Sequence, residues 1–100
     1  MKKEFLEFEN LKYIVRYPEN YESGKRYPVI LHLHGAGGRG TDVNVLLSNP
    51  FFEITDTYED FEFITVAPLC HSNTWFDIFE TLKRFAQKVA NEEFTDRNRF

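Results

Sequence analysis

Residues 28–40 read Pro28-Val29-Ile30-Leu31-His32-Leu33-His34-Gly35-Ala36-Gly37-Gly38-Arg39-Gly40, an apolar run followed by a glycine-rich one. A nearly continuous apolar run is typical of a strand covered on both faces, as in sheets with helices on each side. Four glycines within the next six positions interrupt regular structure. The segment therefore predicts a buried strand followed by an unusual turn.

The segments on either side of this stretch alternate between strand and helix patterns. The expected elements are strands at residues 5–8, 11–17 and 61–67, a short helix at residues 41–49 and a longer helix at residues 75–89. Glu9-Asn10 is the expected turn between the first two strands, and Pro50 is expected to end the short helix. This order predicts an α/β fold of three layers, with helices flanking a mainly parallel sheet, and a single domain over residues 1–100.

Composition limits the classes of function. The chain has 100 residues, of which 42% are hydrophobic and 17% aromatic, so it can build a core. Twelve Lys and Arg against 16 Asp and Glu give a net charge of −4, which disfavours binding to a nucleic acid backbone. No apolar stretch is long enough for a membrane span, and the single cysteine, Cys70, allows no internal disulfide. We therefore expect a cytoplasmic protein that binds neither nucleic acid nor membrane.

The glycine turn has three interpretations. Gly35, Gly37 and Gly40 satisfy the dinucleotide-binding pattern G-x-G-x-x-G, but the next strand ends in Val66-Ala67-Pro68, without the acidic residue that would bind a ribose hydroxyl. A His-Gly-x-Gly turn after a buried strand can instead present backbone N–H groups as an oxyanion hole. The third interpretation is a tight turn with no further role.

The histidines and the single cysteine are residue types that could bind a metal ion. His32 and His34 point to the same face of their strand, and with Cys70 and His71 they could suggest zinc. These residues lie on separate segments, so we expect packed histidines, one of which bonds to the loop backbone, and a buried structural thiol. No metal and no cofactor are expected.

Several stretches resemble the α/β-hydrolase superfamily, in particular its phospholipase/carboxylesterase-like serine esterases, the group that also contains predicted peptidases. The resembling stretches are residues 16–21, 25–31 and 32–37, then Gly40-Thr41-Asp42 with Asn44, Val66 to Cys70 with Trp75, and Asp96 to Phe100. Their order matches the family over almost the whole chain. Val43 is an insertion relative to the family, and Leu69 stands where glutamine is usual.

The resemblance implies the N-terminal half of an α/β-hydrolase fold. The implied activity is hydrolysis of a small-molecule carboxylic ester, or less readily of an amide, through a serine acyl-enzyme. In that scheme the backbone N–H of Ala36 is an oxyanion donor, and Gly35 and Gly37 shape the turn. The second donor would come from the residue after the catalytic serine.

The chain contains no G-x-S-x-G motif, although the family's chemistry requires one. None of Ser23, Ser48 and Ser72 has glycine on both sides, and the sequence stops at Phe100, where the resemblance predicts the nucleophile strand. We therefore expect a partial hydrolase domain that ends before the nucleophile elbow and is inactive alone. Strand 29–34 would have an exposed edge, open to self-association or to the missing C-terminal half. The alternatives are a Rossmann-like dinucleotide-binding module and a non-catalytic interaction module.

Overall fold

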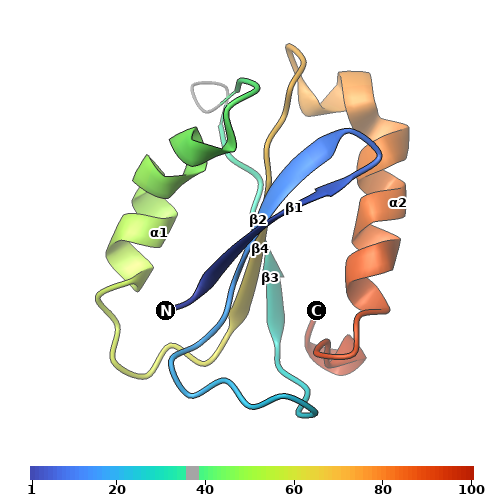
Figure 1. The fold of residues 1–100 in the computed structure, drawn as a ribbon. Helices are drawn as coiled ribbons and strands as arrows, with labels where there is room; N and C mark the ends of the chain where they lie inside the picture. The colour runs from blue at the N-terminus through green and yellow to red at the C-terminus, as the bar shows by residue number, and fades with distance from the viewer. Residues whose placement is uncertain (36–38) are drawn as a thin grey trace.

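The computed structural model of the chain describes residues 1–35 and 39–100 and contains both strands and helices (Figure 1). They are, in chain order, β1 (Lys3–Phe8), β2 (Leu11–Arg16), β3 (Val29–Leu31), the 3₁₀ helix η2 (Val43–Ser48), α1 (Pro50–Thr55), β4 (Ile64–Pro68), η3 (Trp75–Ile78), α2 (Phe79–Ala90) and η4 (Arg97–Arg99).

Strands β1 and β2 form a hairpin whose turn is the predicted pair Glu9-Asn10. Both residues have positive φ angles, 47° and 68°, and Phe8 pairs directly with Leu11. Two central residues with positive φ match the twist of antiparallel strands, and asparagine tolerates this conformation well. The hairpin is therefore encoded locally, by its turn and by the alternation of its strands.

The sheet has the strand order β1-β2-β4-β3 and is mixed. Strand β3 runs parallel to β4, whereas β2 is antiparallel to both β1 and β4. The expectation of a mainly parallel sheet is therefore wrong for the described strands. A two-residue turn can join only antiparallel strands, whereas the long connection through η2 and α1 allows β3 and β4 to be parallel.

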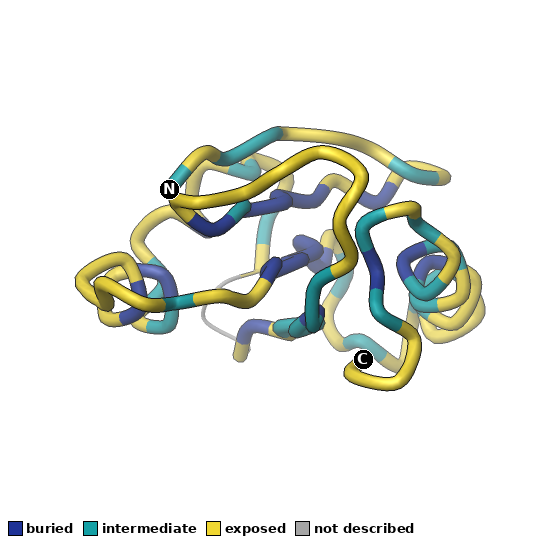
Figure 2. The backbone as a smooth tube through the Cα atoms, turned by 90° about the horizontal axis from the view of Figure 1, so that it is seen from below, coloured by how far each residue is buried: buried dark blue, intermediate teal, exposed yellow. Residues whose placement is uncertain are grey.

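Helices lie on both faces of the sheet, with α1 on one side and α2 on the other (Figure 1). Tyr13, Val15 and Val66 pack against Phe85 and Val89 of α2. The opposite face packs with η2 and α1 in a second core cluster, formed by Ile14, Leu46, Phe52, Ala67 and Leu69. Buried residues follow β2 and β4, whereas β1 at the edge of the sheet is intermediate to exposed, and most of the other exposed residues lie in the loops and on the outer sides of the helices (Figure 2).

The expected short helix is present as η2, which ends at Ser48 before Pro50, whereas α1 has no counterpart among the elements expected from the sequence. Pro50 also opens α1, and Asn49 caps it, since the Asn49 side chain accepts a hydrogen bond from the Phe51 N–H at 2.8 Å. Proline fits the first turn of a helix, where its missing N–H has no partner to lose. The longer helix was predicted correctly in position, although its first turn is the 3₁₀ helix η3 and Phe79 is 53% exposed. In the part of the chain that the structure describes, no helix is long and apolar enough to cross a membrane.

Candidate functional site

The glycine turn begins where β3 and β4 end, at the carboxyl edge of the parallel pair. Two of the residues predicted to form the oxyanion turn, Ala36 and Gly37, lie outside the described residues. Gly35 is described and exposed, and a β-carbon added there would meet no atom within 4 Å. Ligands of open α/β sheets bind at this carboxyl edge, so the turn lies where a site is expected.

His34 connects the start of the turn to the end of β4. Its side chain is buried, with 4% exposure, and its Nε2 accepts a hydrogen bond from the Cys70 backbone N–H at 2.9 Å. Because Nε2 accepts, Nδ1 carries the hydrogen and donates it to the Gly35 carbonyl, 2.6 Å away. The prediction that one of the histidines bonds to the loop backbone is therefore confirmed for His34.

Trp75 completes this arrangement from the other side. Its indole Nε1–H donates to the His34 carbonyl at 3.1 Å, and the two rings lie 4.9 Å apart. The strand end, the Gly35 carbonyl and η3 are thus held together by one imidazole and one indole. The sequence indicated Trp75 as the start of the longer helix and through the family resemblance, and gave no sign of its contact with His34.

The far end of the turn is also bonded to neighbouring segments. The Gly40 N–H donates to the Cys70 carbonyl at 3.1 Å, and Lys12 Nζ donates to the Thr41 carbonyl at 2.8 Å. Arg39 donates from Nη1 to the Asn73 carbonyl at 2.8 Å. Both ends of the turn are therefore fixed to the loop that follows β4, and Lys12 also joins its far end to β2. Sequence reasoning missed these roles of Lys12 and Arg39.

His32 does not join His34 in a ligand set. Its ring stacks on Phe51 with 4.6 Å between centroids, and its buried Nε2 has no hydrogen-bond partner among the described residues. Burial lowers the pKa of the His32 imidazole, and Asn49 opposes this only in part. Cys70 is buried and its Sγ lies 3.5 Å from the Ser72 carbonyl, as a structural thiol would. Over residues 1–35 and 39–100, no three His, Cys, Asp or Glu side chains converge as metal ligands do.

The three serines have local roles and no histidine partner in the described structure. Ser48 Oγ donates to the Val45 carbonyl at 3.0 Å, and Ser23 lies in an exposed loop. Ser72 Oγ donates to Asp77 Oδ2 at 2.8 Å, a bond that lowers the pKa of the Asp77 carboxyl. No Ser-His-Asp triad is formed within the described part of the chain.

One edge of β3 faces away from β4. The Pro28 carbonyl and the His32 N–H bond to β4, so the alternate backbone groups of Val29, Leu31 and Leu33 point to the opposite side. On that side Tyr27 is already paired with residues 94–96, because its N–H donates to the Phe94 carbonyl and its carbonyl accepts from the Asp96 N–H. This pairing is a parallel bridge between Tyr27 and Thr95, which covers the beginning of the edge and leaves the rest without a strand among the described residues.

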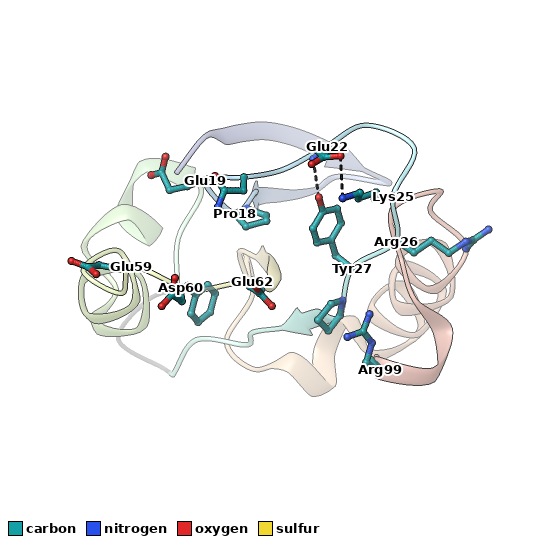
Figure 3. A pocket seen from close by; sticks show the side chains of 13 residues that line it. Pro18, Glu19, Glu22, Lys25, Arg26, Tyr27, Glu59, Asp60, Glu62 and Arg99 are labelled. Carbon is teal, nitrogen blue, oxygen red and sulfur yellow. Dashed lines mark hydrogen bonds and ion pairs between the residues drawn. The ribbon is translucent and has the colours of Figure 1, made fainter.

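Cavities lie at both ends of the sheet. Two of them, of about 270 Å³ and 350 Å³, adjoin His34 and Gly35. Another, of about 310 Å³, lies at the opposite end, where Glu22 contacts both Tyr27 and Lys25 and carboxylates of Glu59, Asp60 and Glu62 line the wall (Figure 3). It lies at the amino ends of β3 and β4, away from the glycine turn, so the cavities at His34 are the better candidate site.

Comparison with known proteins supports the fold alone. No protein-family model matches the sequence, and no curated protein matches it. Among solved structures, the chain is similar to a crystal structure of a thermostable esterase, with a TM-score of 0.59 and 18% sequence identity. The match covers 95% of this chain and 31% of the esterase chain, so this chain spans about a third of that protein. The chain therefore has a mixed α/β, hydrolase-like fold.

Proposed function

We propose that the chain is the N-terminal part of a serine hydrolase that cleaves carboxylic esters, and amides less readily. The observation that carries the proposal is the fixed His34-Gly35 segment at the carboxyl end of β3, beside a strand edge that is still open. An ester hydrolase needs backbone donors at this end of the sheet and a nucleophile on a neighbouring strand.

The oxyanion donor that we assign is the backbone N–H of Ala36. This N–H and the Gly35 carbonyl belong to one peptide group, which is planar. His34 Nδ1 holds the Gly35 carbonyl at 2.6 Å, at the residue that precedes the proposed donor. A backbone donor in this role stabilises the negative oxygen formed when the serine attacks the ester carbonyl, and removing one typically slows an enzyme by ~10²–10³.

The nucleophile would lie on a strand that pairs with the open edge of β3. The bridge between Tyr27 and Thr95 already runs parallel to β3 on that side, so it marks the direction from which a further parallel strand can be added. That strand would come from the same polypeptide or from a partner chain. In either case residues 1–100 alone would hydrolyse no ester above background.

The test combines mass and active-site labelling of the native protein. An antibody against residues 1–100 isolates it, its intact mass is compared with 11.9 kDa, and a fluorophosphonate probe labels any activated serine. We expect label on the isolated polypeptide itself or on a chain bound to it stoichiometrically. Native protein without label would contradict the proposal and favour a non-catalytic interaction module, and saturable binding of a dinucleotide would favour the Rossmann-like alternative.

A further inference from the structure

The cavity of about 270 Å³ beside Gly35 is a distinct chamber at the carboxyl edge of the sheet. Trp75 and Phe76 contribute aromatic rings to its lining, Cys70 and His34 are its buried lining residues, and Arg39 also lines it. We name it the tryptophan cavity. Its volume suits one part of a small ligand rather than a whole drug-sized molecule.

The two aromatic residues differ in what the fold requires of them. The Trp75 indole is fixed by its bond to the His34 carbonyl and packs against the core cluster of α2. Phe76 is 87% exposed and therefore contributes little to the core. Exposing a phenylalanine ring to water is unfavourable, and an apolar ligand in the cavity would remove part of that exposure.

The charge that lines the tryptophan cavity is positive. Among its described lining residues, Arg39 carries the only full charge, and none of them is acidic. The carboxylate of Asp77, which accepts from the Ser72 hydroxyl and the Thr74 N–H, is not among those lining residues. An anionic group would therefore be attracted at this wall and a cationic one repelled.

We propose that the tryptophan cavity binds an apolar group of the substrate and favours one that carries an anionic substituent over one that carries a cationic substituent. The assignment of this group to an ester rests on the function proposed above. Binding of the group to the cavity does not depend on that function. Phe76 supplies the contact surface, and Arg39 supplies the discrimination by charge.

The test uses the 100-residue chain and three probes of the same shape, cyclohexanecarboxylate, cyclohexylmethanol and cyclohexylmethylammonium. Trp75 is the single tryptophan of the chain, so its indole N–H signal in a ¹H–¹⁵N spectrum reports this cavity directly. We expect saturable shifts with dissociation constants on the order of 1 mM, because ligands this small bind weakly. The carboxylate should bind about 2–5-fold more tightly than the ammonium, within the range for an exposed charge contact.

Two substitutions separate the two contributions. Phe76→Ala should weaken all three probes about threefold or more, whereas Phe79→Ala, which removes an exposed phenylalanine outside the cavity, should change none. Arg39→Gln should remove the preference for the carboxylate and leave binding of the alcohol. Absence of a saturable shift, equal effects of the two alanine variants, or equal binding of carboxylate and ammonium to the unsubstituted chain would each overturn the proposal.

The outcome is separate from that of the fluorophosphonate experiment. Probe binding to the cavity with no labelled serine in the native protein would keep the site and remove the ester assignment. A labelled serine without probe binding would keep the hydrolase and remove this cavity as a site.

Discussion

The His34 imidazole is the residue on which the geometry of the candidate site depends most. It is buried, and it accepts from the Cys70 N–H and donates to the Gly35 carbonyl. His34→Ala would leave both backbone groups without this partner and open a void beside Trp75, so we expect a loss of about 2–4 kcal/mol in the free energy of unfolding. Urea denaturation measures this loss, and faster hydrogen exchange of the Cys70 amide would locate it.

His71 provides the matched control, because it is a histidine close in sequence to Cys70 but exposed. We expect His71→Ala to change the free energy of unfolding by less than ~0.5 kcal/mol. Equal effects of the two alanine variants would contradict the anchoring role of His34.

His32 should make the stability of the chain depend on pH. Burial lowers the pKa of its imidazole below that of the unfolded chain, so the unfolded state binds more protons between the two values. The free energy of unfolding should therefore be greatest above the unfolded value of about pH 6.5 and should fall as the pH is lowered below it. His32→Phe keeps an aromatic ring over Phe51 and removes the titration, so urea denaturation across this range should show a flatter dependence. An unchanged slope in this variant would assign the dependence to another group.

For single residues, the sequence could predict only contacts between near neighbours in the chain. The bond from His34 to Gly35 joins adjacent residues, and a histidine before a glycine turn indicates it. Cys70 and Trp75 are 36 and 41 positions away from His34, so their contacts depend on the pairing of β3 with β4 and on where η3 begins. No local pattern encodes either contact.

Among the elements, α1 is held to the sheet by an unusual contact with β2. Arg16 is fully buried, and its guanidinium bonds to Asp56 at 3.2 Å and to Thr65 Oγ1 at 3.1 Å. Its carbon Cζ also lies 4.9 Å from the ring centroid of Phe52 and 4.8 Å from that of Phe61. Burial lowers the pKa of Arg16, and Asp56 opposes that effect. The flat guanidinium thus joins both ends of residues 52–61 to the sheet.

We expect Arg16→Lys to destabilise the chain more than Arg16→Met, although lysine keeps the charge. An ammonium is a strongly hydrated point charge that cannot make both bonds and stack between two rings, so its burial should cost about 1–3 kcal/mol. Methionine fits an apolar aromatic environment, and Asp56 would retain Lys3 and solvent as partners. Urea denaturation ranks the two variants, and hydrogen exchange of the Asp56 amide, which donates to the Phe52 carbonyl, follows α1 itself.

Arg84→Lys is the control for the loss of an arginine as such. Arg84 pairs with Glu9 at the surface, where an exposed ion pair contributes little, so this variant should stay within ~0.5 kcal/mol of the unsubstituted chain. If the Arg16→Lys variant proved as stable as Arg16→Met, the planar geometry of the Arg16 guanidinium would not be what holds α1 to the sheet.

Element positions were more predictable than element ends. The alternation in residues 11–16 and the apolar spacing from Trp75 onward identified β2 and the longer helix, because each pattern extends over several periods. Pro50 both follows the end of η2 and opens α1, and the sequence indicated only the first of these, because the cap at Asn49 marks a new helix only once Asn49 accepts from Phe51. Short elements such as α1 offer too few residues for a periodic signal.

For the whole molecule, the strand order β1-β2-β4-β3 places the most apolar strand at one end of the sheet. The sequence predicted mixed α and β elements and helices on both faces, because these follow from local patterns. It did not predict that the sheet is mixed, since pairing of β2 with β4 brings together segments about fifty positions apart. That pairing is decided by the packing of both sheet faces, which only the complete fold specifies.

The open edge of β3 gives the molecule its clearest expected behaviour in solution. Beyond Tyr27, the backbone groups of Val29, Leu31 and Leu33 face no strand of the described chain, and Leu33 is 40% exposed. An apolar edge of this kind pairs with other chains, so residues 1–100 should form dimers or larger species at micromolar concentration. Leu33→Lys places a charge beside the edge and should shift the chain toward monomer in sedimentation velocity experiments. Leu47→Lys makes the same change at a residue of equal exposure, 40%, on η2 and away from the edge, and should leave the distribution unchanged. A stable monomer of the unsubstituted chain, or equal effects of the two lysine variants, would show that the edge of β3 does not pair with other chains. That result would remove the physical reason for placing the proposed nucleophile strand beside β3.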